Sequence, residues 1–395
     1  MSDASVTTGR ATAAADAAGG MALEARDLRL CDRDGNALVC GVDLAVAPGE
    51  FVGLVGESGS GKTLSVRACL GIVPEGVSVE ASRLRLAGED LLGASPETHR
   101  RLLGTQVGFV PQNTMAFLQP AMRVKSQLVD GYLTWHPGVS RREALDRAEE
   151  LLAKTGIEDP RRVMGSYPKG LSGGQRQRVN VAMALMGDPR IVVADEPTAA
   201  LDRIVQGQVM DLLTGLARER GAALLVISHN LSLVRARCER VYVMYAGRCV
   251  ERGLVSDVLR NPGHPYTRAL LGAQPHVGMA RDERLVESPG TMPGRGRDAL
   301  ACAFAPRCPL ATAACSEGVP AMVPEGRAPR AAEGRPASSS GRLGAVVHEV
   351  ACLRAWEGVR KGATRGEGVT RGEAAAGVEG AMRVEGATDG GGEAR

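Results

Sequence analysis

The sequence predicts an α/β fold, in which helices cover a mostly parallel sheet. Four short apolar segments, at residues 51–55, 107–110, 191–195 and 222–227, alternate with longer stretches of helical periodicity. This alternation is typical of parallel strands that are joined by helices and buried on both faces. A glycine-rich turn connects the first apolar segment to a helical stretch. A strand, such a turn and a helix in succession form the context of a phosphate-binding loop.

Other strands are predicted beside this core. Residues 22–30 and 38–46 alternate apolar and polar side chains on either side of a turn. Residues 241–245 and 248–251 predict a hairpin around Ala246 and Gly247, and residues 83–86 favour one more strand. Two alternating segments joined by a short turn predict a pair of antiparallel strands.

A helical block from about residue 120 to 188 interrupts the series of strands, and we expect it to be an inserted subdomain. Within it, residues 141–154 carry apolar side chains on one face and charges on the other, which predicts an amphipathic helix. Ser140 and Glu143 have the spacing of a capping box at its start. A further long helix is predicted over residues 176–186.

The composition favours a cytosolic protein of several domains. A chain of 395 residues has room for two or three domains, and a net charge of +3 argues for no nucleic-acid partner. No apolar run is long enough to span a membrane. Residues 1–21 lack the apolar core of a secretion signal and, like residues 357–395, have the composition of a disordered segment. We therefore expect any membrane association to come through a partner.

The glycine-rich turn contains the residue types that bind nucleotide phosphates. It consists of Gly56, Glu57, Ser58, Gly59, Ser60, Gly61, Lys62 and Thr63. The glycines let the backbone N–H groups approach phosphate oxygens, and the following helix adds its positive dipole end. Lys62 is expected to reach the β- and γ-phosphates, and the Thr63 hydroxyl to hold Mg²⁺. We call residues 56–63 the phosphate-binding loop.

Polar side chains follow three of the predicted strands. Asp195 and Glu196 come directly after one strand, Gln112 after another and His229 after a third. Asp195 can hold Mg²⁺, and Glu196 can polarise a water molecule for attack on a γ-phosphate. Gln112 can bind Mg²⁺ or that water, and His229 can contact the phosphate. The sequence therefore predicts a hydrolytic site at this edge of the sheet.

A second phosphate-binding feature lies far along the chain, where Ser172, Gly173, Gly174 and Gln175 open a helix. Its glycines permit close backbone approach, and the helix N-terminus favours an anion. One nucleotide does not need both features from a single chain. The pattern therefore predicts a dimer in which each chain completes the site of the other.

These motifs together resemble the nucleotide-binding subunit of ATP-binding cassette (ABC) transporters. The resemblance covers about residues 22–275 and rests on GESGSGKT at 56–63, Gln112, LSGGQRQR at 171–178, VVADEPTAALD at 192–202 and His229. It implies an ABC-type core over residues 22–260, with a small antiparallel β subdomain beside the helical subdomain.

The same resemblance implies roles for single residues. The chain's own ATP and Mg²⁺ would be served by Lys62, Thr63, Gln112, Asp195, Glu196 and His229. Ser172 and Gly174 would contact the ATP held by a partner subunit, and Asp202 would lie on a loop that communicates across the dimer. The family usually stacks the adenine on an aromatic residue of the first strand, but residues 28–32 contain none. Either nucleotide affinity is reduced, or another side chain takes that place.

The segment after the cassette indicates a particular group within this family. Residues 261–271, 289–293 and 302–309 are similar to the C-terminal domain of oligopeptide and dipeptide import ATPases, a group that includes nickel and metallophore importers. We expect this domain to span residues 261–356. The group membership implies a second ATPase subunit in a homodimer or heterodimer, two membrane permeases and an extracytoplasmic binding protein.

Four cysteines of this domain, Cys302, Cys308, Cys315 and Cys352, remain to be explained. Disulfides are not expected in the cytosol, and the domain is poor in apolar residues, so a metal centre would stabilise it. Four thiolates suit a [4Fe–4S] cluster, and some relatives are similar in carrying one there. Zinc is the runner-up, with His348 as an alternative fourth donor, and buried free thiols are the remaining interpretation.

The sequence thus predicts an ATPase at the cytoplasmic face of the cell membrane that energises the import of di- or oligopeptides. Two alternatives stay open. In the first alternative, the cargo is nickel or a metallophore instead of a peptide. In the second, the chain is a non-transport ABC ATPase. Non-transport members usually carry two cassettes or coiled-coil arms, whereas this chain has one cassette and an importer-type extension.

Overall fold

The computed structural model describes residues 20–198, 203–274, 290–294, 301–324, 331–332 and 347–355. Asp202, the predicted tail and all but two residues of the predicted leader lie outside the described residues. The boundary expected near residue 260 stays a prediction.

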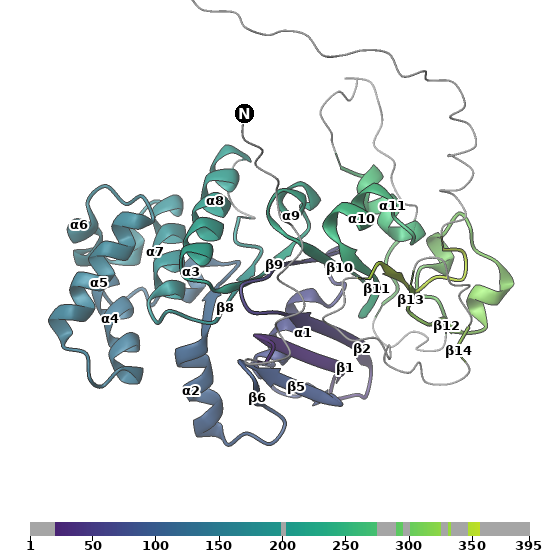
Figure 1. Cartoon of the computed structure of the whole chain (residues 1–395), viewed down its shortest axis with the longest axis horizontal. Coiled ribbons are helices and arrows are strands. Elements are labelled where there is room, and N and C mark those ends of the chain that lie inside the picture. The colour runs from purple at the N-terminus through teal and green to yellow at the C-terminus, as the bar shows by residue number, and fades with distance from the viewer. Residues whose placement is uncertain are drawn as a thin grey trace, which may run out of the picture. The chain divides into compact units, whose positions relative to one another are not determined.

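The larger of the sheets has eight strands. They are β3 (Phe51–Val55), β7 (Val107–Val110), β8 (Ile191–Asp195), β9 (Ala223–Ser228), β10 (Arg240–Tyr245), β11 (Arg248–Leu254), β13 (Val323–Pro324) and β15 (Glu349–Val350). Their order is β13-β15-β11-β10-β3-β9-β8-β7, and the strands from β10 to β7 pair in parallel (Figure 1). All residues of β3, β8 and β9 are buried, as expected for strands covered on both faces. The predicted mostly parallel sheet is confirmed.

A second, antiparallel sheet lies beside it. Its strands are β1 (Leu23–Cys31), β2 (Ala37–Val46), β4 (Ser78–Glu80), β5 (Arg83–Leu86) and β6 (Glu89–Asp90). They run in the order β2-β1-β5-β6, and β4 also pairs with β1. Strand β4 has no signal in the sequence, since it exposes two of its three residues and has no apolar pattern. Two short strands, β12 (Val319–Pro320) and β14 (Ala331–Ala332), pair separately.

The helices that the periodicity predicted within residues 141–154 and 176–186 are present, and several shorter helices accompany them. The described helices are α1 (Lys62–Cys69), α2 (Pro96–Gln106), α3 (Thr114–Phe117), α4 (Val124–Trp135), α5 (Arg141–Lys154), α6 (Pro160–Gly165), α7 (Gly173–Leu185), α8 (Arg203–Glu219), α9 (Leu231–Arg237), α10 (Val255–Arg260) and α11 (Pro265–Gly272), with 3₁₀ turns η1 (Pro168–Gly170), η2 (Ala305–Arg307) and η3 (Ala313–Ser316). Helices α4 to α7 gather at one end of the molecule (Figure 1). Along the described ranges no helix combines the length and apolarity needed to cross a membrane.

The capping box at the start of α5 is confirmed. The Ser140 hydroxyl accepts a hydrogen bond from the Glu143 N–H at 3.2 Å, and the Glu143 carboxylate accepts one from the Ser140 N–H at 2.8 Å. Helix α2 was missed because Leu102 is its only buried residue, so its sequence lacks an apolar stripe.

Two hydrophobic cores lie on the two faces of the larger sheet. Successive side chains of a strand point to opposite faces, so Val192 belongs to one core and Val193 to the other. The first core joins the sheet to α5, α7 and α8. The second joins it to α1 and the antiparallel sheet. This packing fixes where the carboxyl ends of the parallel strands lie.

The C-terminal segment extends the larger sheet. Strand β15 pairs with both β11 and β13. A buried hydrogen bond of 2.7 Å joins His348 Nε2 to Glu251 Oε1, and Arg252 Nε donates to Glu349 Oε2 at 2.6 Å. The His348 ring, an alternative metal donor on the sequence alone, is thus engaged by a carboxylate.

Candidate functional site

The phosphate-binding loop follows β3 and ends in the first turn of α1. Gly59 and Gly61 have positive φ angles of 80° and 96°, which side chains rarely tolerate. A Cβ atom on Gly56 would lie 2.2 Å from the Met244 carbonyl oxygen, so only glycine fits there. The Lys62 ammonium is buried and donates to the carbonyl oxygens of Gly56 and Glu57 at 2.8 Å each. Burial lowers the pKa of Lys62, and the nearby carboxylates of Glu196, Asp195 and Glu57 oppose this shift.

The residues predicted to hold Mg²⁺ lie together. The Thr63 hydroxyl donates a 2.8 Å hydrogen bond to Asp195 Oδ1 across 132 residues of sequence. Burial raises the pKa of the Asp195 carboxyl, and the hydrogen bond from Thr63 opposes that rise. A hydroxyl and a carboxylate oxygen are the hard donors that Mg²⁺ prefers, so these two residues fit the ion.

Glu196 is the centre of a second group. Its carboxylate oxygen Oε2 lies 3.1 Å from Gln112 Nε2 and 3.4 Å from His229 Nδ1. The three side chains come from the ends of neighbouring strands β8, β7 and β9, which is why they converge. Glu196 has a positive φ angle of 44°, and its N–H donates to the Ile227 carbonyl at 3.0 Å. Backbone strain of this kind occurs where a side chain must be aimed.

A cavity of about 590 Å³ unites these groups. Lys62, Thr63, Gln112, Glu196 and His229 all line it. No Phe, Tyr or Trp is among its described lining residues, which include the apolar Ala37, Leu38 and Ala303 and the guanidinium of Arg248. The absence of an aromatic residue in the first strand is thus not offset by another aromatic side chain in the described wall.

The second phosphate-binding feature lies at the start of α7. Ser172 Oγ accepts from the Gln175 N–H at 3.2 Å, and Gln175 Oε1 accepts from the Ser172 N–H at 3.1 Å. This capping box starts the helix at Gly173, three residues earlier than predicted. Ser172 and Gly173 are exposed, and none of residues 172–175 is among those that line the cavity.

The four C-terminal cysteines are free thiols. The Cys302 N–H donates to the Cys315 carbonyl at 3.0 Å. Burial raises the pKa of the Cys352 thiol to about 12, and the charges of Cys302, Cys308 and Cys315 add to the rise. Across the described residues, no three His, Cys, Asp or Glu side chains are arranged so that they could hold a metal ion. The arrangement therefore gives no support to the predicted metal centre.

Sequence reasoning missed the contacts that the C-terminal segment makes with this site. Tyr266 Oη accepts from the Glu57 N–H at 2.8 Å, Arg307 pairs with the Glu57 carboxylate, and Gln274 Nε2 donates to the His229 carbonyl at 2.9 Å. Tyr266 and Arg307 stand within the importer-type motifs, but nothing local in the sequence indicates what they contact.

Two segments of this chain match known protein families. Residues 39–199 match the ABC transporter family, and residues 250–315 match the oligopeptide/dipeptide transporter C-terminal region. The probable D,D-dipeptide transport ATP-binding protein DdpD of Escherichia coli is 43% identical over 282 residues, which cover 71% of this chain and 85% of that protein. The oligopeptide transport ATP-binding protein OppD of Mycobacterium tuberculosis is 40% identical over 331 residues, which cover 83% of this chain and 54% of that protein.

Solved structures agree with these matches. An ATP-binding cassette solved as a dimer in a post-hydrolysis state with ADP and phosphate aligns with a TM-score of 0.52 and 26% identity, covering 59% of this chain and 98% of that one. The chain therefore belongs to the ATP-hydrolysing subunits of ABC transporters, in the branch that carries the oligopeptide/dipeptide transporter C-terminal region.

Proposed function

We propose that this chain is the ATPase subunit of an importer of di- or oligopeptides. The observation that carries the proposal is the joint match of residues 39–199 and 250–315, the second of which belongs to oligopeptide and dipeptide transporters. The names of the relatives in Escherichia coli and Mycobacterium tuberculosis support it.

Within that function, each group of the cavity has a distinct task. Lys62 and the backbone of the phosphate-binding loop bind the β- and γ-phosphates. Thr63 and Asp195 hold Mg²⁺, which neutralises charge on the phosphates. Glu196 takes a proton from the attacking water, with Gln112 and His229 holding the water and the γ-phosphate.

The second phosphate-binding feature serves a partner. Ser172, Gly173, Gly174 and Gln175 contact the ATP of a second ATPase subunit, identical or related, and Asp202 joins the dimer interface. Support comes from the exposure of Ser172 and Gly173 and from the fact that none of residues 172–175 lines the chain's own cavity.

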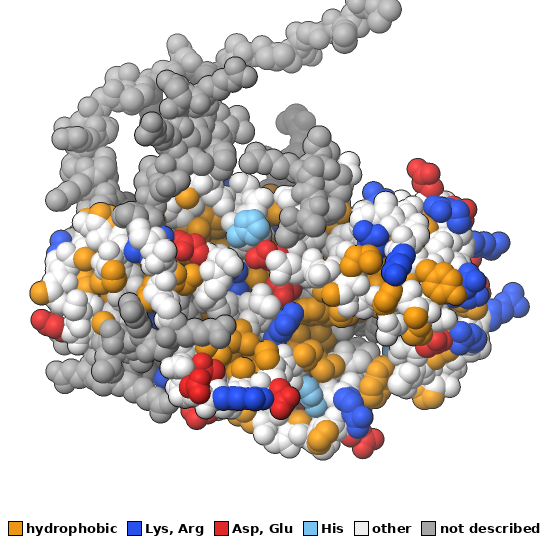
Figure 2. Space-filling view, turned by 180° about the vertical axis from the view of Figure 1, so that it is seen from behind, with side chains coloured by type: hydrophobic (Ala, Val, Ile, Leu, Met, Phe, Trp, Pro, Cys, Tyr) orange, Lys and Arg blue, Asp and Glu red, His pale blue; other side chains and the backbone are white. Residues whose placement is uncertain are grey.

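An exposed apolar patch supports the proposed contact with the membrane permeases. We define it as Met115, Phe117, Met122 and Tyr167, whose exposed fractions run from 38% to 45%. Tyr167 lies 4.9 Å from the Arg123 guanidinium, so its ring adjoins the segment that follows Gln112. Figure 2 shows orange side chains among blue ones over this helical part, on the right of the view. A permease seated here, with an extracytoplasmic binding protein beyond it, keeps the chain peripheral at the cytoplasmic face.

The test of the function is purification of the full chain from membranes. Two permease subunits and a second ATPase are expected to co-purify, and ATP turnover of the complex is expected to rise with a peptide-loaded binding protein. Stimulation by nickel or a metallophore, with none by peptides, would reassign the cargo. Purification without any membrane protein would favour a non-transport ABC ATPase.

Phe117→Asp is expected to lower the amount of co-purified permease at least about tenfold, because a charge replaces an apolar contact at an interface. ATP binding should be unchanged, since Phe117 is not a lining residue of the cavity. Leu92→Asp is the matched control, since Leu92 is 50% exposed but lies outside the patch. Equal loss in both variants would refute a permease contact at the patch.

We also propose that Cys302, Cys308, Cys315 and Cys352 hold one metal centre, a [4Fe–4S] cluster in preference to zinc. What supports it is the sequence, which carries four thiols between residues 302 and 352, whereas across the described residues no three such side chains are arranged to hold a metal ion. The segment has few large apolar side chains, and a metal centre would stabilise its fold.

The measurement is iron, sulfide and zinc analysis with visible absorption after anaerobic purification. About four iron and four sulfide per chain are expected for a cluster of this type. Cys308→Ser should lose the metal and unfold the C-terminal segment while the cassette still binds ATP. Folded wild-type protein with neither iron nor zinc would leave these residues as buried thiols.

A further inference from the structure

All three polar groups of Glu57, the second residue of the phosphate-binding loop, have partners. Its carbonyl oxygen accepts from Lys62 Nζ at 2.8 Å. Its N–H donates to Tyr266 Oη at 2.8 Å, across 209 residues of sequence. Its carboxylate receives both Nη1 and Nη2 of Arg307, at 3.0 and 3.3 Å, across 250 residues. The carbonyl oxygen also accepts from the Ser60 N–H at 3.2 Å, within the loop. Two partners of Glu57 therefore come from the C-terminal segment, and another is the phosphate-binding lysine.

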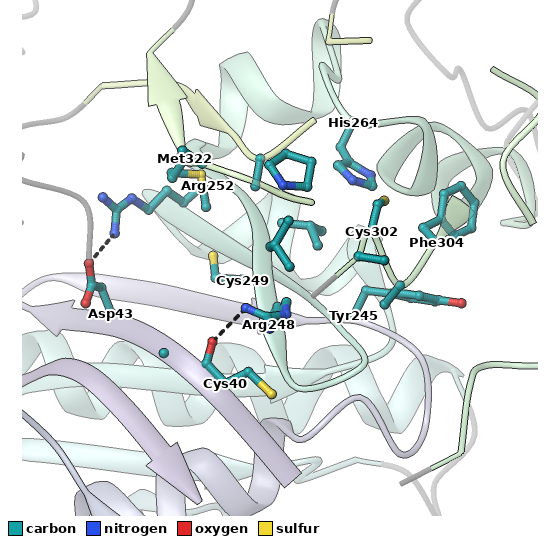
Figure 3. A pocket seen from close by; sticks show the side chains of 18 residues that line it. Cys40, Asp43, Tyr245, Arg248, Cys249, Arg252, His264, Cys302, Phe304 and Met322 are labelled. Atoms are coloured by element: carbon teal, nitrogen blue, oxygen red, sulfur yellow. Dashed lines mark hydrogen bonds and ion pairs between the residues drawn. The ribbon is translucent and has the colours of Figure 1, made fainter. Parts of the chain in front are cut away.

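The residues that reach Glu57 are themselves firmly held. Arg307 is 8% exposed, and its Nη1 also donates to Tyr245 Oη at 3.2 Å. The rings of Tyr245, Tyr266 and Phe304 lie 4.6 to 5.5 Å apart, and the exposed fraction of each is at most 1%. Figure 3 shows Tyr245 and Phe304 side by side at the edge of a smaller cavity. In a chain with only 3% aromatic residues, this cluster joins the end of β10 to the C-terminal segment.

The C-terminal segment also forms part of the nucleotide cavity. Pro293, Gly294 and Ala303 line it together with Lys62 and Thr63. A change in the position of this segment would therefore alter the wall of the cavity and the loop within it.

We propose that Arg307 and Tyr266 are positioning residues for ATP binding, which hold Glu57 and thereby fix the first turn of the phosphate-binding loop. This inference rests on the proposed nucleotide site at Lys62. A glycine-rich loop is conformationally free, and closing it around phosphates costs entropy. Anchors at Glu57 reduce that cost before ATP arrives, so they increase affinity without touching the nucleotide.

The prediction is a loss of ATP affinity with little loss of maximal turnover. Arg307→Ala in the full chain should raise the Kd for ATP about tenfold, because a charge-assisted bidentate contact is lost. Tyr266→Phe keeps the buried ring but removes the acceptor, so it should raise the Kd about fivefold. In the assembled transporter the KM should rise in parallel, with kcat unchanged at saturating ATP.

A double-mutant cycle tests whether Arg307 acts through Glu57. Glu57→Gln combined with Arg307→Ala should weaken ATP binding no more than Arg307→Ala alone. Arg307→Lys keeps the positive charge but loses the two parallel N–H donors of the guanidinium. Its ATP affinity should therefore lie between those of the wild type and Arg307→Ala. The matched control is Arg240→Lys. Arg240 is 6% exposed and pairs with Glu50 at 3.0 Å. This pair lies where β10 and β3 begin, whereas the phosphate-binding loop follows the end of β3. The control variant should lower the Tm and leave the Kd unchanged.

Lys62→Ala distinguishes a failure of the positioning role from a failure of the proposed nucleotide site. If it abolishes ATP binding while Arg307→Ala and Tyr266→Phe keep the wild-type Kd, the positioning role is wrong and the site stands. If Lys62→Ala itself keeps the wild-type Kd, the proposed site is wrong. Fully additive effects of Glu57→Gln and Arg307→Ala would show that the two residues act separately and would also overturn the inference.

Discussion

Glu196→Gln is expected to lower ATP turnover in the assembled transporter at least about 100-fold, the usual contribution of a general base. The amide keeps the shape of the side chain but does not accept a proton. ATP binding should be retained, because Lys62, Thr63 and Asp195 form a separate group around the phosphate-binding loop. Single-turnover hydrolysis and equilibrium binding of ATP measure the two properties independently.

The matched control for this change is Glu239→Gln. Glu239 is more exposed than Glu196 and follows the end of a helix, and its carboxylate accepts from the Phe51 N–H at 3.4 Å, at the start of β3 and away from the loop that follows this strand. Turnover should stay near that of the wild type in this control. Near-normal turnover of Glu196→Gln would remove Glu196 from its assigned role.

Ser172→Arg is expected to lower turnover about 100-fold at the composite site whose phosphate-binding loop belongs to the partner subunit. Loss of a preorganised anion-binding group has an effect of this size. The chain's own Lys62 site should keep its ATP affinity, because Ser172 is exposed and is not among the lining residues of that cavity. In a heterodimer, site-specific nucleotide occupancy and hydrolysis distinguish the two sites.

A homodimer requires a complementation test. Chains with Ser172→Arg mixed with chains with Lys62→Ala should regain turnover, because the mixed dimer contains one intact composite site. Ser140→Arg is the matched control, since Ser140 caps α5 with the same kind of capping box and loses a similar stabilisation of about 1 kcal/mol. No recovery in the mixture, or damage confined to the site with the variant chain's own Lys62, would contradict the composite site.

The parts of the site that the sequence predicted depend on residues that are close neighbours in the chain. A strand followed by a polar residue places that residue at the carboxyl edge of a parallel sheet, so Gln112, Glu196 and His229 could be expected to converge. The spacing of the glycines in residues 56–63 likewise determines the backbone conformation of the phosphate-binding loop, because glycine tolerates positive φ angles. The structure places these side chains on one cavity, as the spacing predicted.

The elements that the sequence analysis missed lack such local signals. Strand β4 exists because it pairs with β1, and β13 and β15 exist because they extend the sheet beyond β11. Two-residue strands contain too few side chains to show a period of two. Pairing with a distant strand supplies the hydrogen bonds that define them.

The sequence by itself determined the sheet, the phosphate-binding loop and the converging side chains, because periodicity and glycine spacing act over a few neighbouring residues. Only the tertiary structure decided that the C-terminal segment holds that loop. The contacts of Glu57 with Tyr266 and Arg307 join residues that are 209 and 250 positions apart. They depend on the burial of Tyr245, Tyr266 and Phe304 in one cluster, and no local pattern specifies which distant partner a buried aromatic ring or an arginine will meet.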